Sequence, residues 1–160
     1  MHSARFTKTG IGAGATGSDM ADYTAVKRQT SELPPVLCRN ADGASPFVLV
    51  CDHASNRIPP EYGDLGLTPS QRLMHIAWDP GAVAVARRLS RRLDAPLVES
   101  TISRLVVDCN RAADAPDLIP ELSERTVIPG NRDLTQAERA ARLAAAHPPF
   151  HEAIRTVLDA

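Results

Sequence analysis

Apolar runs and helical periodicities alternate along the chain from about residue 36 onward. The continuous apolar run 47–51 predicts a strand that is covered on both faces. Residues 81–93 place apolar side chains at helical spacing with arginines opposite them, which predicts an amphipathic helix. The apolar positions of this helix are Val85, Leu89 and Leu93. Two further strands are expected at 96–99 and 105–108.

Helix-start signals place the remaining helices. Thr68 is followed by proline, which predicts an N-cap and a short helix ending near Ile76. Asp79 is also followed by proline and is expected to cap the helix at 81–93. Near the C-terminal end, Thr135 caps an alanine- and arginine-rich helix. The adjacent prolines at 148 and 149 are expected to break or kink it.

The order of elements is strand, helix, strand, strand, helix, which predicts an α/β fold with helices on the faces of a partly parallel sheet. Three strands are few for this class, so we expect a chain that lacks a C-terminal part, with a compact small domain as the alternative. Residues 1–33 are glycine-rich at 10–17 and lack a hydrophobic period, which predicts a disordered tail. The folded part is expected at 34–160, with a long polar loop at 110–133.

Composition excludes several classes of protein. The chain has 160 residues, enough for one domain, and a net charge of −1, so no basic face for nucleic acid is expected. No apolar stretch approaches the roughly 20 residues that span a bilayer. The three cysteines lack a C-x-x-C spacing, and a reducing cytoplasm is the expected location. The oligomeric state does not follow from the sequence.

The richest candidate chemistry lies where the first apolar run ends, at Asp52 and His53. A histidine at a strand end can bind zinc, with a neighbouring carboxylate orienting its ring, or it can be an ordinary hydrogen-bonded loop residue. Asp79 offers a second carboxylate, although a purely capping role is equally consistent with its position before a proline. His75 precedes it by four residues, which on one helix would place the two on a common face, but Pro80 opposes that arrangement.

Basic and amide side chains bracket the run 105–108. Arg104 precedes it, and Asn110 and Arg111 follow it. Arginine binds carboxylates bidentately, so the group suits an acidic substrate, but arginines can also be the solvated ends of a buried strand. His147 and His151 are four residues apart with two prolines between them, and we interpret them as structural.

Four segments occur in an order that resembles the N-formylglutamate amidohydrolase family. They are CDHASNRIP at 51–59, HIAWD at 75–79, SRLVVDCNR at 103–111 and VIPGN at 127–131. The resemblance implies a three-layer α/β/α fold with a mixed sheet, like that of zinc carboxypeptidases and aspartoacylases. It also implies one catalytic zinc ion and hydrolysis of the N-acyl bond of an acidic amino acid such as N-formylglutamate, a reaction of histidine degradation.

The resemblance assigns roles to individual residues. His53 matches the first zinc-ligand histidine, and Asn56 stands where the wider superfamily often has a glutamate ligand. Asp79 is then our choice for the carboxylate ligand. The residues expected to bind the substrate carboxylate and polarise the scissile carbonyl are Arg104, Asn110 and Arg111.

The resemblance also exposes a departure from the family. Members continue with a strand ending in a His-Ser pair, which supplies the remaining zinc ligand, and with a later glutamate suited to act as general base. Neither is present, so the sequence resembles the N-terminal portion of such an enzyme. One alternative is a catalytically incompetent domain that acts as an interaction module. Another is a cysteine hydrolase in which Cys51 or Cys109 pairs with His53, although burial of a thiol disfavours it.

Overall fold

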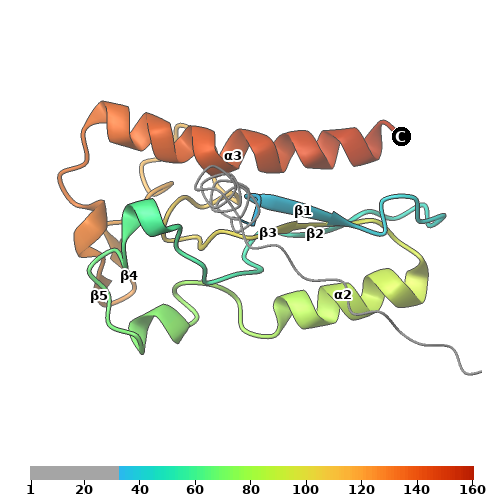
Figure 1. Cartoon of the computed structure of the whole chain (residues 1–160), viewed down its shortest axis with the longest axis horizontal. Coiled ribbons are helices and arrows are strands. Elements are labelled where there is room, and N and C mark those ends of the chain that lie inside the picture. Colours follow the sequence, from blue (N-terminus) through green and yellow to red (C-terminus); the bar gives the residue numbers. More distant parts are fainter. Residues whose placement is uncertain (1–32) are drawn as a thin grey trace, which may run out of the picture. The chain divides into compact units, whose positions relative to one another are not determined.

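A computed structural model describes residues 33–160, and the predicted disordered tail lies outside them except for its last residue. A three-stranded sheet organises this part of the chain (Figure 1). Its central strand β3 (Leu97–Ser100) pairs antiparallel with β1 (Val36–Arg39) and parallel with β2 (Leu49–Cys51). The mixed, partly parallel sheet expected from the sequence is therefore present, and the expected strands at 47–51 and 96–99 are confirmed with small shifts.

The central strand buries a charged residue. All four residues of β3 are buried, and Glu99 is one of them. Its carboxylate accepts hydrogen bonds from Arg39 Nε on β1 at 2.7 Å and from Arg87 Nε at 2.9 Å. These charge-assisted bonds compensate the carboxylate for its loss of water.

Two helices cover opposite faces of the sheet (Figure 1): α2 (Ala82–Leu93) and α3 (Gln136–Leu158). The predicted cap of α3 is confirmed, because Thr135 and Glu138 form a reciprocal capping box. The predicted break is wrong, since α3 continues as one helix through both prolines. Buried Ala146 and Phe150 lie on either side of the prolines, and their packing holds the helix together there.

Helix α2 exposes the side that its pattern predicted to be buried. The side chains at 85, 89 and 93 are all exposed, whereas Ser90 is buried. The side that faces the sheet carries Arg87, whose guanidinium donates to Glu99. The small apolar side chains of the same side pack against a buried cluster of Cys51, Ala54 and Leu97; they are Ala82, Val83 and Ala86. The prediction that Asp79 caps α2 is also wrong, because Gly81 with φ +89° occupies the N-cap position. Asp79 contributes its backbone carbonyl, which accepts from the Ala82 N–H, and not its side chain.

Several other elements differ from expectation. The helix predicted at 68–76 is only a 3-10 turn, Gln71–Leu73, and strand β1 was not predicted. Residues 105–108 are not a strand, although all four are buried. The predicted loop at 110–133 contains a hairpin of two short strands, followed by a 3-10 turn. The elements not yet bounded are η1 (Pro60–Tyr62), β4 (Leu122–Ser123), β5 (Thr126–Val127) and η3 (Pro129–Asn131).

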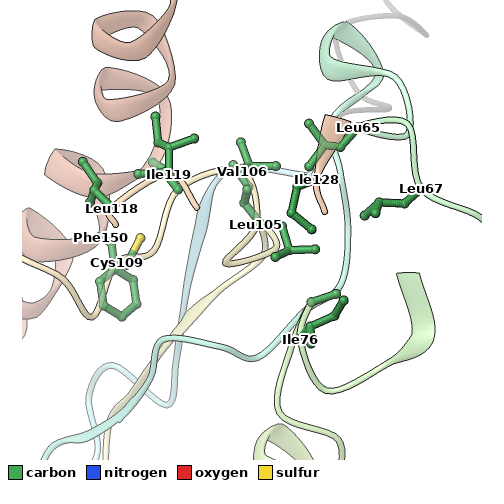
Figure 2. Close-up of a cluster of buried hydrophobic side chains, with 14 of the residues drawn as sticks. Leu65, Leu67, Ile76, Leu105, Val106, Cys109, Leu118, Ile119, Ile128 and Phe150 are labelled. Carbon is green, nitrogen blue, oxygen red and sulfur yellow. The ribbon is translucent and has the colours of Figure 1, made fainter. Parts of the chain in front are cut away.

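The main hydrophobic core is formed largely by side chains from the irregular segments 102–109 and 118–128, with only Val98 from the sheet fully buried in it. Figure 2 shows Leu105 and Val106 among Ile119, Ile128 and Phe150, all of which are buried. A buried amide substitutes for the missing strand pairing in this region. The side chain of Asn131 donates to the carbonyl oxygens of Leu105 at 2.8 Å and Pro120 at 2.6 Å, and it accepts from Arg142.

Strand β2 forms one edge of the described sheet, with only β3 beside it. Val50 is 48% exposed and Phe47 is 65% exposed, so the expectation that this run is covered on both faces is wrong. Within residues 33–160, no helix is both long enough and apolar enough to cross a membrane.

Candidate metal and substrate site

Two loops meet just beyond the end of β2. The strand ends at Cys51, and the backbone N–H of His53 donates to Asp52 Oδ1 at 3.0 Å. The backbone N–H of Asp79 donates to the His53 carbonyl at 3.0 Å, which ties the segment before α2 to this turn. That hydrogen bond brings His53 and Asp79 together although 26 positions separate them.

The His53 ring lies between two carboxylates. Nε2 is 2.7 Å from Asp108 Oδ1, and Nδ1 is 3.3 Å from Asp79 Oδ2. Burial alone would lower the pKa of His53, but the hydrogen bond to Asp108 and the negative charges of Asp108 and Asp52 outweigh it and raise that pKa above its usual value. The carboxylates therefore favour a protonated ring.

Asp108 is the centre of a group of contacting side chains that we call the His53 cluster: His53, Asp79, Arg104, Asp108 and Arg111. Its side chain is only 5% exposed, and it accepts from the backbone N–H of Asn110 at 3.0 Å and from Arg104 Nη2 at 3.1 Å. Burial raises the pKa of Asp108, but the hydrogen bonds from His53 and the Asn110 backbone, with the positive charges nearby, hold it below its usual range. The sequence analysis gave Asp108 no role. The signal that could have found it is a carboxylate ending a buried apolar run, which needs partners.

Both candidate arginines reach this cluster. Arg104 Nη1 lies 3.5 Å from Asp79 Oδ1, in addition to its bond with Asp108. Arg111 Nε lies 3.7 Å from Asp108 Oδ2, and Arg111 Nη1 lies 2.9 Å from Asp117 Oδ2. Asn110 is exposed and joins the cluster through its backbone. The structure thus brings together all the residues that the resemblance selected, and their roles stay predictions.

Helix α3 holds the loop that carries Asn110 and Arg111. His147 Nε2 lies 2.9 Å from the Arg111 carbonyl oxygen, and His151 Nε2 lies 3.1 Å from that of Cys109. The two imidazole rings pack with centroids 4.4 Å apart. These contacts agree with the structural interpretation of both histidines.

His75 contacts Glu124 rather than the residues around His53. Its ring is 2.9 Å from Glu124 Oε1 and largely exposed. Segment 74–79 has no helix, so His75 and Asp79 do not share a helical face. Over residues 33–160, no three side chains of the His, Cys, Asp and Glu types are arranged to hold one metal ion.

His53 follows an edge strand of the described sheet, and its side chain is only 6% exposed. Its neighbours are nevertheless carboxylates rather than apolar groups. The ring is therefore buried among polar groups.

The buried thiols of Cys51 and Cys109 are poor nucleophiles. Burial raises the pKa of Cys51 to about 11, with Asp52, Glu99 and Asp79 adding to the shift. Burial likewise raises the pKa of Cys109 to about 12. Because the thiolate is the reactive form, this geometry disfavours a cysteine hydrolase.

A family model and a solved structure are both similar to this chain. The N-formylglutamate amidohydrolase family matches residues 45–160. The crystal structure of gene product Atu2144 from Agrobacterium tumefaciens is similar, with 46% sequence identity and a TM-score of 0.78. The match covers 79% of this chain and 50% of that one, so the chain spans about half the length of the Agrobacterium protein. No curated protein matches. The chain belongs to the N-formylglutamate amidohydrolase family.

Proposed function

We propose that the His53 cluster is part of a zinc-dependent amidohydrolase site for N-acyl acidic amino acids such as N-formylglutamate. The observation that carries this proposal is the arrangement of His53 between Asp79 and Asp108, with two arginines beside the carboxylates. Family membership supports the amidohydrolase chemistry. The zinc ion and the substrate are the parts that need testing.

The separation of His53 and Asp79 fits two ligands of one zinc ion. A nitrogen and an oxygen bound to tetrahedral zinc at about 2.0–2.1 Å lie about 3.3–3.4 Å apart. The distance from His53 Nδ1 to Asp79 Oδ2 is 3.3 Å. Asp108, on the other ring nitrogen, would fix the tautomer and orientation of the imidazole, as carboxylates do for zinc-bound histidines.

Zinc bound there would supply a water of lowered pKa and polarise the scissile carbonyl. The residues of this chain would orient the substrate. Arg111 is held by an exposed ion pair with Asp117, which is weak and can exchange for a substrate carboxylate. Arg104 is braced by two carboxylates and so is fixed for donation to an acyl oxygen or a carboxylate.

The proposed zinc site requires a further ligand. Catalytic zinc sites normally use three protein ligands and a water molecule, and His53 and Asp79 provide two. We propose that the third ligand and the general base come from outside these 160 residues. On this proposal the 160-residue chain binds zinc weakly and turns over N-formylglutamate slowly.

The test measures metal and activity separately. Zinc content after dialysis is compared for the wild type, His53→Ala and Asp79→Asn, and formate release from N-formylglutamate is followed with and without added zinc. His75→Ala is the matched control, because this exposed histidine lies outside the cluster. We expect zinc retention to fall in the two cluster variants and to be unchanged in the control.

Two outcomes would contradict the proposal. Loss of zinc in His75→Ala would place the metal elsewhere. Fast, metal-dependent turnover by a monomer of this chain would show that all ligands are within it. In a longer protein that is active, Arg111→Lys should lose activity although it keeps the charge, because an ammonium group cannot form the bidentate pair.

A further inference from the structure

The turn that carries Arg111 belongs to no helix or strand. Residues 109–111 form a turn and a bend between irregular segments. The backbone N–H of Asn110 donates to Asp108 Oδ1 at 3.0 Å, and that of Arg111 donates to the Asp108 carbonyl at 3.1 Å. These bonds satisfy two N–H groups of the turn. The carbonyl oxygens of Cys109 and Arg111 take their partners from helix α3 instead.

Two imidazole rings of α3 contact these carbonyls. His147 Nε2 lies 2.9 Å from the Arg111 oxygen, and His151 Nε2 lies 3.1 Å from the Cys109 oxygen. A carbonyl oxygen can only accept, so Nε2 of each ring carries the proton and donates it. The two histidines are four residues apart on one helix and so share a face. Helix α3 therefore holds the turn on both sides of Asn110.

The two rings are themselves supported by the core. Phe150 is buried, and its ring meets the ring of His151 edge-on with centroids 5.7 Å apart. The ring of His151 also contacts that of His147, with centroids 4.4 Å apart. Side-chain contacts thus run from the hydrophobic core through both imidazoles to the turn. The two donors are held in place before any ligand binds.

This backbone support matters because side-chain contacts hold Arg111 only weakly. Its side chain is 46% exposed, and its partner at 2.9 Å is the exposed carboxylate of Asp117. Exposed ion pairs of this kind contribute little. A bidentate bond to a carboxylate requires a defined orientation of the guanidinium, and a fixed backbone lowers the entropic cost of reaching it.

We propose that His147 and His151 are positioning residues, which hold the backbone of Arg111 so that its guanidinium is oriented for the carboxylate of the substrate. The sequence alone indicated only a structural role for these histidines. The inference rests on the proposed function for what Arg111 binds. The ordering of Arg111 by the two imidazoles needs neither substrate nor metal.

The first test measures the order of Arg111 in the 160-residue chain, in EDTA. The order parameter of its Nε–H is obtained by ¹⁵N relaxation, after assignment by the loss of this resonance in Arg111→Lys. His147→Leu removes the donor, whereas His147→Gln keeps an amide N–H of similar reach. We expect the order parameter to fall in His147→Leu and to stay near the wild-type value in His147→Gln. The Nε–H of Arg104 is the internal reference, because the partners of this arginine are Asp79 and Asp108, and it should not change.

The second test measures binding of N-formylglutamate by titration in EDTA. His147→Leu should weaken binding by about two- to tenfold, the range expected for one lost hydrogen bond, and His147→Gln should restore it. His151→Leu should weaken binding less, because its ring holds the carbonyl of Cys109 rather than that of Arg111. His75→Leu is the matched control, since His75 is exposed and pairs with Glu124, and it should bind like the wild type.

The proposal is overturned if Arg111 is as ordered in His147→Leu as in the wild type, or if His147→Gln does not restore its order. An equal fall for Arg104 would also overturn it, because the variant would then have loosened the whole region. Should His147→Leu fail to fold, the wild-type chain decides: a neutral His147 ring with its proton on Nε2 supports the proposal, and one with its proton on Nδ1 overturns it. Failure of the wild type to bind N-formylglutamate, with the expected order parameters, supports the positioning role and contradicts only the proposed substrate.

Discussion

Replacing Asp108 by asparagine should destabilise the fold by about 2–4 kcal/mol. Asparagine keeps one carbonyl oxygen, which can still accept from His53 or from the Asn110 backbone. Its amide nitrogen, however, takes the place of the oxygen that accepts from Arg104 at 3.1 Å. A charge-assisted hydrogen bond then becomes a contact between two donors.

The magnitude follows from the exposure of the partners. A hydrogen bond to a charged group contributes about 1.5–3 kcal/mol, and Arg104 recovers part of this because it can turn toward water. Arg111, at 3.7 Å and half exposed, adds only about 0–1 kcal/mol. The remaining loss is the attraction between the buried Asp108 charge and protonated His53.

The loss should depend on pH in a defined direction. The raised pKa of His53 adds stability at pH values below the unfolded value of about 6.5, and this stability disappears as pH rises through the folded pKa. The lowered pKa of Asp108 adds stability above its unfolded value of about 3.9 that is lost on acidification through the folded pKa. The difference between wild type and Asp108→Asn should therefore be largest between about pH 4 and 6.5.

Urea unfolding measures the effect, with far-UV circular dichroism and the fluorescence of Trp78, the single tryptophan, as probes. EDTA is present throughout to exclude metal binding. Asp117→Asn is the control, since its ion pair with Arg111 is exposed on both sides and should cost less than about 1 kcal/mol. Equal losses in the two variants, or a loss in Asp108→Asn that does not vary with pH, would refute this account of the cluster.

Three other changes test the rest of the fold. Burial raises the pKa of Glu99, but the hydrogen bonds from Arg87 and Arg39 hold it below its usual value, so its contribution is present above about pH 4.3 and lost on acidification. Glu99→Gln should cost about 2–4 kcal/mol at pH 7 and much less at pH 3, measured by urea unfolding. Phe150→Ala should cost about 3–5 kcal/mol by opening a cavity, measured in the same way. Leu89→Lys, on the exposed side of α2, should reduce self-association measured by sedimentation velocity.

Local signals in the sequence predicted the elements whose cause is local. Strands β2 and β3 follow from short apolar runs, and the start of α3 follows from the Thr135–Glu138 capping box. The run at 105–108 has the same apolar character but is not a strand. Its backbone pairs with distant groups instead, through the side chain of Asn131 and the carbonyl of Leu118. No window of neighbouring residues contains that information.

The orientation of α2 was unpredictable for a similar reason. Hydrophobic spacing favours burial of the side that carries Leu89. The side that faces the sheet instead carries Arg87, because the carboxylate of Glu99 on the central strand needs a partner. The bond to a buried charge on another element and the packing of small apolar side chains together cover this side of the helix.

The sequence predicted which residues belong to the candidate site better than it predicted how they are arranged. His53 and Asp79 meet through a backbone hydrogen bond between two loops, which their spacing could not indicate. His75 lies apart from these residues because segment 74–79 forms turns and no helix, which agrees with the effect expected of Pro80 on the residue before it. Asp108 was missed although a carboxylate that ends a buried apolar run needs partners, and its four partners come from segments whose positions the sequence did not predict.

Among the described residues, Glu99 and Asp108 are buried carboxylates, and they differ in the kind of element that supplies their partners. Glu99 connects a strand and a helix to the central strand, and its partners, Arg39 and Arg87, belong to regular elements. Asp108 instead joins His53 and Arg104 on irregular segments. Replacing a buried ion pair by apolar groups often costs a protein no stability, so the Asp108 cluster is poorly explained as a stabilising device. Titratable groups with shifted pKa values, gathered at loops beyond a strand end, are typical of sites that bind or react, and this supports the proposed site around His53 and Asp108.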